Sequence, residues 1–283
     1  MTEREPVAHR GTGEPPPGVP AVVEQLLADA SLELVMRGRR ADVVLAAPER
    51  RNPQTPATWR AFAALTGWLD SRADVVVVSA RGPTFSAGLD RRAFTPEGVP
   101  GEPSLLALAA MDDEQLDAAI AVYQQGFTGW SQGSFVSIAA VQGHAVGAGF
   151  QLALACDLRI VADDVQFAMR ETALGLVPDL GGTKPLVDAV GYPRALEICA
   201  TGRVVAAAEA LAVGLVQEVV PASELPAAVD RLADALLAGD AGAIAATKAL
   251  LRDAGSRDGA QQRAAERRAQ ADRLRRLAAR AMR

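Results

Sequence analysis

Two carboxylates and one side-chain amide have the chemistry and the spacing for proton transfer. Glu171 and Asp179 are eight residues apart, and Gln151 precedes Glu171 by twenty residues. A carboxylate can take a proton from a substrate and return it, which is general acid–base catalysis. If both acids share a pocket, their repulsion should raise one pKa and place an acid beside a base. Gln151 could hold a water molecule, but an amide cannot deprotonate water at neutral pH.

Two glycine-containing turns could position backbone amides near these acids. The turn Phe85–Asp90 follows the apolar run 75–78, and the turn 147–149 follows the apolar run 135–141. A helix-compatible run begins right after the second turn, and the free N–H groups of a helix start attract negative charge. Two such turns aimed at one oxygen would stabilise an oxyanion. Alternatively, both turns are simply tight connections between strands and helices.

The two turns carry a family resemblance. Phe-Ser-Ala-Gly-Leu-Asp, followed about fifty residues later by Ala-Val-Gln-Gly-His-Ala-Val-Gly-Ala-Gly, resembles the crotonase superfamily of enoyl-CoA hydratases and isomerases. The resemblance covers roughly residues 32–255 and implies an α/β fold with a crotonase-like ββα spiral core. It also implies that the amides of Leu89 and Ala148 stabilise a thioester enolate, where losing one donor typically costs ~3–4 kcal/mol. The residues expected beside the substrate are Ala87, Gly88, Asp90, Gly147 and Gln151.

The resemblance is less complete for the proton-transfer residues. Crotonase hydratases have two glutamates, whose positions are occupied here by Gln151 and Glu171. Asp179 stands where hydratases usually have glycine, and partly resembles an aspartate of dienoyl-CoA isomerases and chlorobenzoyl-CoA dehalogenases. Related isomerases that move a double bond from position 3 to position 2 can work with one glutamate. We therefore expect isomerisation by Glu171, assisted by Asp179, with hydration or non-catalytic acyl-CoA binding as the alternatives.

These residues also have structural interpretations. Glu171 could be a surface carboxylate paired with Arg170, and Asp179 could be a loop residue or a helix N-cap before Leu180. His144 lies inside the second motif, and we interpret it as structural.

The substrate would include coenzyme A, and no permanently bound cofactor is expected. In the resembled family the loop 48–53 lines the coenzyme A site, so Arg50 and Arg51 could meet phosphates. Lys248 resembles a lysine that touches coenzyme A phosphates. The alternative for all three side chains is a solvated surface charge.

Local sequence patterns predict the strands and helices that must position these residues. Residues 31–36 and 41–46 read as two strands of a hairpin around the turn 37–40. Thr55 and Pro56 predict a helix start as N-cap and first helical residue. Further helices are expected over residues 116–130, 193–202 and 206–212. Alternating strands and helices favour a βαβ arrangement with its site at the strand ends.

The chain divides into three expected regions. Residues 1–30, rich in proline at the start, are predicted to form a disordered or loosely packed leader. Residues 31–220 should form the acyl-CoA-binding core, and residues 221–283 a C-terminal helical subdomain. By resemblance that subdomain makes the contacts of a homotrimer or a dimer of trimers. The tail 261–283 holds eight arginines and reads as a basic helix, either packed on a neighbour or bound to a membrane or nucleic acid.

Composition narrows the function classes. The chain has 283 residues, of which 49% are hydrophobic, enough for a sizeable core without disulfides. A net charge of −5 argues against a dedicated nucleic-acid binder. No signal-peptide pattern and no membrane-length apolar run are present, so we expect a cytoplasmic protein without membrane association. Cys156 and Cys199 should be buried thiols, and two histidines with two cysteines make a transition-metal site unexpected.

Overall fold

The computed structural model describes residues 18–282, and residues 1–17 and 283 lie outside the described part. Residues 1–17 of the predicted leader 1–30 therefore fall outside it, but residues 18–30 do not. Helix α1 (Ala21–Asp29) buries Val23 and Leu27 in the main hydrophobic core. The predicted boundary at residue 30 is wrong, because these apolar side chains gain more by packing on α2 and β1 than by staying in solvent.

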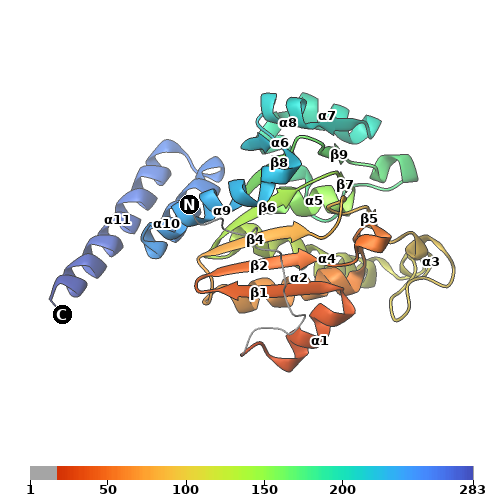
Figure 1. Cartoon of the computed structure of the whole chain (residues 1–283), viewed down its shortest axis with the longest axis horizontal. Coiled ribbons are helices and arrows are strands. Elements are labelled where there is room, and N and C mark those ends of the chain that lie inside the picture. The colour runs from red at the N-terminus through yellow and green to blue at the C-terminus, as the bar shows by residue number, and fades with distance from the viewer. Residues whose placement is uncertain (1–17, 283) are drawn as a thin grey trace, which may run out of the picture.

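A six-stranded sheet forms the centre of the molecule, in the order β1-β2-β4-β6-β8-β11 (Figure 1). The first pair is the predicted antiparallel hairpin, and every later neighbour pair is parallel. Parallel strands end at the same edge, which gathers the loops that follow them. The strands are β1 Leu32–Arg37, β2 Arg40–Leu45, β4 Val75–Ala80, β6 Val136–Val141, β8 Leu158–Ala162 and β11 Glu218–Val220.

Helices cover both faces of this sheet. Because successive side chains of a strand point to opposite faces, Val76 and Val78 pack on one side and Val75 and Val77 on the other. The first face is covered by α1, α2 (Pro56–Leu69), α4 (Asp113–Gln132) and α5 (Ala148–Ala155), and the second by α9 (Leu225–Leu237). The predicted start of α2 is confirmed: Thr55 is its N-cap and closes a capping box.

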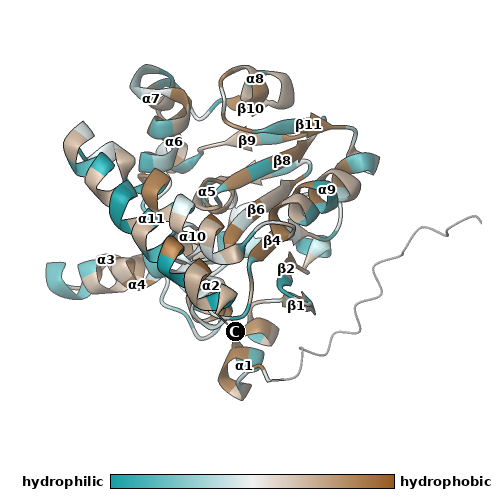
Figure 2. Cartoon of the chain, turned by 90° about the vertical axis from the view of Figure 1, so that its left-hand side faces the viewer, coloured by the Kyte–Doolittle hydropathy of each residue, from teal (hydrophilic) through white to brown (hydrophobic). Residues whose placement is uncertain are grey.

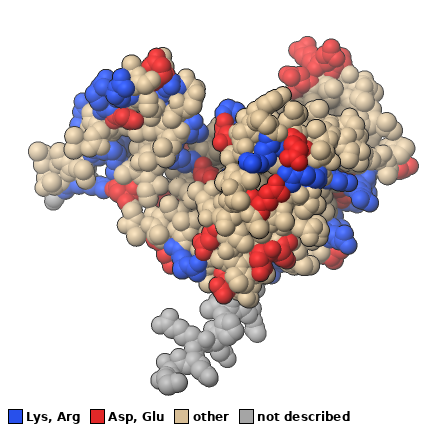
Figure 3. Space-filling view, turned by 90° about the horizontal axis from the view of Figure 1, so that it is seen from above, with Lys and Arg blue, Asp and Glu red and all other residues tan. Residues whose placement is uncertain are grey.

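The predicted boundary between core and C-terminal subdomain is also wrong. Helix α9 starts after residue 220, yet Val229 and Ala233 are buried against strands β4, β6 and β8. The part that projects from the body is α10 (Ala241–Arg252) with α11 (Gly259–Ala281), which we call the C-terminal arm (Figure 1). Figure 2 shows α11 largely in hydrophilic colours, and Figure 3 shows Lys and Arg gathered on this arm at the left.

Two smaller sheets accompany the main sheet, and β5 of one of them contains Leu89. One has the order β10-β9-β7, and the other pairs β3 with β5. Their strands are β3 Pro53–Gln54, β5 Gly88–Leu89, β7 His144–Val146, β9 Gln166–Ala168 and β10 Val204–Ala206. The remaining helices are α3 Leu105–Ala109, α6 Thr183–Val190, α7 Tyr192–Thr201 and α8 Ala207–Ala212, with short 3₁₀ turns η1 Pro48–Arg50, η2 Arg91–Phe94, η3 Glu171–Leu174, η4 Ala222–Glu224 and η5 Ala254–Ser256. Within residues 18–282 no helix is both long and apolar enough to cross a membrane.

Candidate active site

The two glycine-containing turns run side by side. Ser86 donates its amide to the His144 carbonyl at 3.0 Å, and Val146 donates its amide back to the Ser86 carbonyl at 3.0 Å. Gly88 has φ +84°, and a Cβ at this position would lie 2.4 Å from the Val146 carbonyl oxygen and 3.5 Å from the Ala148 nitrogen. Only glycine fits this approach, so the backbones of both turns meet at Gly88.

Four buried polar residues hold the first turn, and sequence reasoning missed them. Asn52 donates from its side chain to the carbonyls of Arg81 and Thr84 at 3.0 and 2.8 Å. Ser86 donates from its hydroxyl to the Asn52 carbonyl at 2.7 Å and accepts from Gln54 at 3.2 Å. The indole of Trp59 donates to Gln54 at 2.9 Å. A signal for this network was available, because polar residues between apolar runs must be hydrogen-bonded when buried.

The backbone amides of Leu89 and Ala148 do not donate hydrogen bonds within their own elements, the β3–β5 pair and helix α5. Asp90 donates its amide to the Gln54 carbonyl at 2.8 Å, and successive amides of a strand point to opposite sides. The Leu89 amide therefore points away from β3. Ala148 is the first residue of α5, where an amide has no acceptor within the helix. Both predicted donors can thus face a ligand.

Glu171 lies beside the second turn. Gly147 has φ +51°, and a Cβ there would lie 3.3 Å from Glu171 Oε1. The Gly147 amide donates to the Ala168 carbonyl at 2.8 Å, which ties the turn to the segment that leads into Glu171. The expected alternative of a surface pair with Arg170 is wrong, since the Arg170 guanidinium donates to the Gly202 carbonyl at 3.0 Å.

Burial changes the proton affinity of both acids. Desolvation raises the pKa of Glu171, the negative charge of Asp179 raises it further, and a hydrogen bond from Gln151 opposes the rise. Desolvation also raises the pKa of Asp179. Burial is thus the main cause for both acids, and the charge of Asp179 is a smaller cause for Glu171. Asp179 is not a helix N-cap, because α6 begins at Thr183 and its N-cap is Gly182.

Gln151 is not open to substrate, which corrects its predicted role as a substrate contact. The residue is 1% exposed, and its side-chain nitrogen donates to Glu171 Oε1 at 2.7 Å. Its side-chain oxygen accepts from the amides of Leu180 and Gly182 at 3.0 and 3.3 Å. Both polar atoms are therefore used within the protein. The other oxygen of the carboxylate, Glu171 Oε2, is buried and has no hydrogen-bond partner among the described residues.

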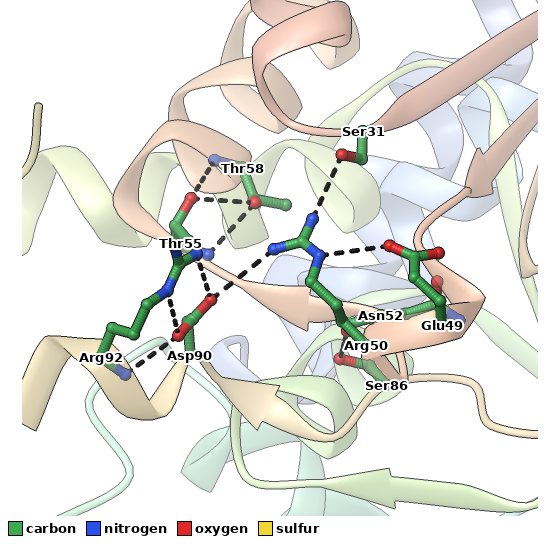
Figure 4. Close-up of polar contacts among 9 residues, drawn as sticks. All are labelled: Ser31, Glu49, Arg50, Asn52, Thr55, Thr58, Ser86, Asp90 and Arg92. Atoms are coloured by element: carbon green, nitrogen blue, oxygen red, sulfur yellow. Dashed lines mark hydrogen bonds and ion pairs between the residues drawn. The ribbon is translucent and has the colours of Figure 1, made fainter. Parts of the chain in front are cut away.

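Asp90 also differs from its predicted role as a substrate contact (Figure 4). Its buried carboxylate accepts from the Arg92 amide at 3.0 Å and from the Arg92 guanidinium at 3.0 and 2.8 Å. The hydrogen bond from Arg92 holds the pKa of Asp90 below its usual range, with the charge of Arg50 adding to the effect. Asp90 is the N-cap of the η2 turn, and it thereby stabilises the loop after Leu89.

Arg50 lies at the rim of this region and remains a candidate for phosphate contact. Its guanidinium is 3.8 Å from Asp90 Oδ2, 3.4 Å from Ser31 Oγ and 3.3 Å from Glu49 Oε1 (Figure 4). The side chain is 45% exposed, so these contacts leave donors free. Ala87, next to the turn, is exposed as well.

Lys248 lies far from the site, which corrects its predicted contact with coenzyme A. Its ammonium donates to the Phe135 carbonyl at 2.6 Å and to Asp157 Oδ2 at 2.7 Å, and the side chain is 10% exposed. Phe135 precedes strand β6, whereas the second turn follows β6 and β7. All of these bonds are made within the protein, at the opposite end of β6 from that turn.

No group of three or more potential metal ligands occurs in residues 18–282. Both cysteines are free thiols: Cys156 is buried, and burial raises its pKa to about 12, while Cys199 is partly buried. His144 is exposed and contributes its main-chain carbonyl to the first turn. The site is thus built from two amides and two carboxylates, which suits proton transfer next to a developing oxyanion.

Known proteins are similar to this chain in sequence and in fold. The family model for enoyl-CoA hydratase/isomerase matches residues 41–280. The chain is 34% identical over 254 residues to "Probable enoyl-CoA hydratase EchA17" of Mycobacterium tuberculosis, covering 89% of this chain and 90% of that protein. A "putative enoyl-CoA hydratase" from Thermobifida fusca YX, crystallised with acetoacetyl-CoA, is 48% identical with a TM-score of 0.85, covering 89% of this chain and 98% of that one. DspI of Pseudomonas aeruginosa is 29% identical with a TM-score of 0.75, covering 86% and 88%. These matches confirm the predicted crotonase-type α/β fold, and the chain belongs to the enoyl-CoA hydratase/isomerase family.

Proposed function

We propose that this protein isomerises an enoyl-CoA by moving its double bond from position 3 to position 2. The observation that carries the proposal is the state of Glu171: one oxygen accepts from Gln151 and the other is buried without a protein partner. A single carboxylate with one free oxygen can take a proton from C2 and return it to C4. Gln151 stands where a second base would be needed to activate water, and an amide does not supply one.

The proposed reaction begins with the thioester carbonyl between the two turns. The amides of Leu89 and Ala148 donate to its oxygen, which gains negative charge as the C2–H bond breaks and Glu171 takes the proton. The electron pair moves through the enolate, and the O–H bond of Glu171 then breaks as a C4–H bond forms. Asp179, which raises the pKa of Glu171, helps the carboxyl hold the proton between the two steps.

Coenzyme A would enter as part of the substrate. A structural neighbour from Thermobifida fusca YX was crystallised with CoA, and another crystal of it contains acetoacetyl-CoA. In this chain Arg50 is an exposed cation beside the first turn, and we assign it to a coenzyme A phosphate. Gly88 and Gly147 let the thioester approach the backbone closely.

Hydration of a 2-enoyl-CoA is the second candidate, because the relatives that match most of the chain are named as hydratases. In that case Asp179 would have to replace the missing second glutamate. Binding of acyl-CoA without turnover is the alternative of another class, and Gln151 favours it. Two desolvated carboxylates favour an enzyme, since burying charge without a chemical use is costly.

Purified protein incubated with 3-enoyl-CoA, 2-enoyl-CoA and dienoyl-CoA decides among these functions. We expect double-bond migration in 3-enoyl-CoA, and a roughly 10²–10⁴-fold lower kcat in Glu171→Gln, because the proton acceptor is lost. Water addition to 2-enoyl-CoA that is faster than migration would instead establish the hydratase. Tight binding of acetoacetyl-CoA with no turnover of any substrate would establish the binder.

A further inference from the structure

A single side chain joins the catalytic carboxylate to the loop that carries the second acid. Gln151 extends from the first turn of α5, and it is 1% exposed. Its nitrogen donates to Glu171, while its oxygen accepts from Leu180 and Gly182, immediately after Asp179. All three bonds connect segments that are 20 to 31 residues apart in the chain.

We propose that Gln151 is the positioning residue of this site, holding Oε1 of Glu171 so that Oε2 alone transfers the proton. The catalytic consequence of this inference rests on the proposed function. The hold of Gln151 on Glu171 does not, because it follows from the hydrogen bonds alone. An amide nitrogen can donate only, so it fixes which oxygen of Glu171 is occupied. The opposite end of the same amide accepts two backbone N–H groups, which prevents the side chain from flipping.

Few polar and titratable groups surround the Glu171 carboxylate. Oε2 is buried without a hydrogen-bond partner in the described chain, and Oε1 and Oε2 would lie 3.3 and 3.7 Å from a Cβ on Gly147. The titratable group that acts on Glu171 is Asp179, which follows η3. Burial raises the pKa of Cys199 on α7, and the charge of Glu171 raises it further. The nearest guanidinium, Arg170, is bonded to a carbonyl instead.

This arrangement has a consequence for reaction choice. Water activation in a two-carboxylate site needs a second acceptor on the water, but the Gln151 oxygen is filled by two backbone amides. The Gln151 oxygen therefore cannot accept a hydrogen bond from a water molecule, and the Gln151 nitrogen immobilises Glu171, the one base left beside it. A base with one free oxygen suits transfer between two carbons of the same substrate better than deprotonation of water.

The test measures the pKa of Glu171 directly, without substrate. Protein labelled with glutamate carrying ¹³C at its side-chain carboxyl is titrated by NMR, and the Glu171 signal is assigned by its absence in Glu171→Gln. In Gln151→Met the donor is lost at nearly constant volume, so the ionised form is less stabilised and the pKa of Glu171 should rise. Gln151→Leu likewise removes the donor without adding a charge, and should also raise it.

Gln124→Met is the matched control. Gln124 donates to the Asp179 carbonyl at 2.7 Å, so its loss loosens the same loop without touching Glu171. We expect the pKa of Glu171 to stay at its original value in this variant. An equal rise in Gln124→Met, or no rise in either Gln151 variant, would overturn the proposal. If Gln151→Met does not fold, Gln151→Leu decides.

Kinetics then separate this inference from the proposed function. With 3-enoyl-CoA, Gln151→Met should lower kcat roughly tenfold or more, change KM little, and move the acidic limb of the pH profile to higher pH. An unchanged acidic limb contradicts the positioning role. If the parent protein shows no turnover, isomerisation is rejected. If the pKa of Glu171 still rises in the Gln151 variants, the positioning of Glu171 by Gln151 stands.

Discussion

At the scale of single residues, the contacts and the raised pKa of Glu171 decide what the site can do. Its carboxylate lies against the Gly147 turn, accepts one hydrogen bond from Gln151, and has a pKa raised mainly by burial. A base must be ionised to accept a proton, so activity should fall as the pH decreases toward this raised pKa. The same shift must affect stability, because folding then favours the protonated form.

Replacing Glu171 with Gln should stabilise the protein at neutral pH. The sign follows from linkage: a raised folded pKa adds stability below the unfolded pKa, and that stability is lost as pH rises through the folded pKa. The amide does not ionise, so the variant avoids the loss. Thermal unfolding between pH 4 and pH 8 should show a higher Tm for Glu171→Gln at pH 8, with the difference shrinking toward pH 4.

Glu224→Gln, at an exposed glutamate, serves as the control, and its Tm should follow the parent protein throughout. A Tm difference for Glu171→Gln that does not change with pH would contradict the raised pKa.

At the scale of elements, the position of α10 depends on one buried ion pair. Lys248 on α10 bonds to Asp157 and to the main chain before β6, while Asp157 also accepts from the Ser137 hydroxyl at 2.9 Å. The Lys248 and Asp157 side chains are 10% and 21% exposed. This lysine therefore holds the C-terminal arm to the main sheet instead of contacting coenzyme A.

Lys248→Met should lower the free energy of unfolding by about 3 kcal/mol, because it leaves the partly buried Asp157 charge unpaired. Urea unfolding measures this loss, and acetoacetyl-CoA affinity should stay unchanged. Lys184→Met is the matched control: Lys184 pairs with Asp188 on the surface and is 77% exposed, so its loss should be within about 0.5 kcal/mol. Weaker acetoacetyl-CoA binding at unchanged stability would restore the role first expected for Lys248.

At the scale of the whole molecule, the C-terminal arm is a largely uncovered part of the described chain. Helix α11 has one buried residue, Ala265, over 23 residues, and Leu251, Leu274 and Leu277 are 70%, 54% and 53% exposed. Its arginines are partly neutralised, since Asp240 pairs with Arg280 at 2.7 Å and also with Arg273. These ion pairs leave less free positive charge for an anionic membrane or nucleic acid, and the homotrimer that the family resemblance implies stays a prediction.

Light scattering after size exclusion should give three times the chain mass of 29.5 kDa, or six times for a dimer of trimers. Placing Asp at both Leu274 and Leu277 should lower this mass to that of smaller species, because charge would be buried at the contact. Arg275→Ala, on the same helix and 76% exposed, should leave the mass unchanged. A monomeric parent protein would reject the trimer.

The sequence alone determined the local parts of this protein. Apolar runs defined the strands, Thr55 and Pro56 the start of α2, and glycines the turns at 88 and 147, because these features depend on neighbouring residues and on backbone freedom. The resemblance carried by those turns predicted the family and fold, and identified Glu171 and Asp179. The matched family model and the structural neighbours confirm the family and the fold.

Only the tertiary structure decided what distant residues do to one another. Gln151 meets Leu180 across 29 residues, Lys248 meets Asp157 across 91, and α9 joins the core through strands far earlier in the chain. Sequence patterns record spacing along the chain, whereas these contacts depend on how buried polar groups find partners in space. For that reason Gln151 and Lys248, both predicted as ligand contacts, are bonded instead to Glu171 and to Asp157 within the protein.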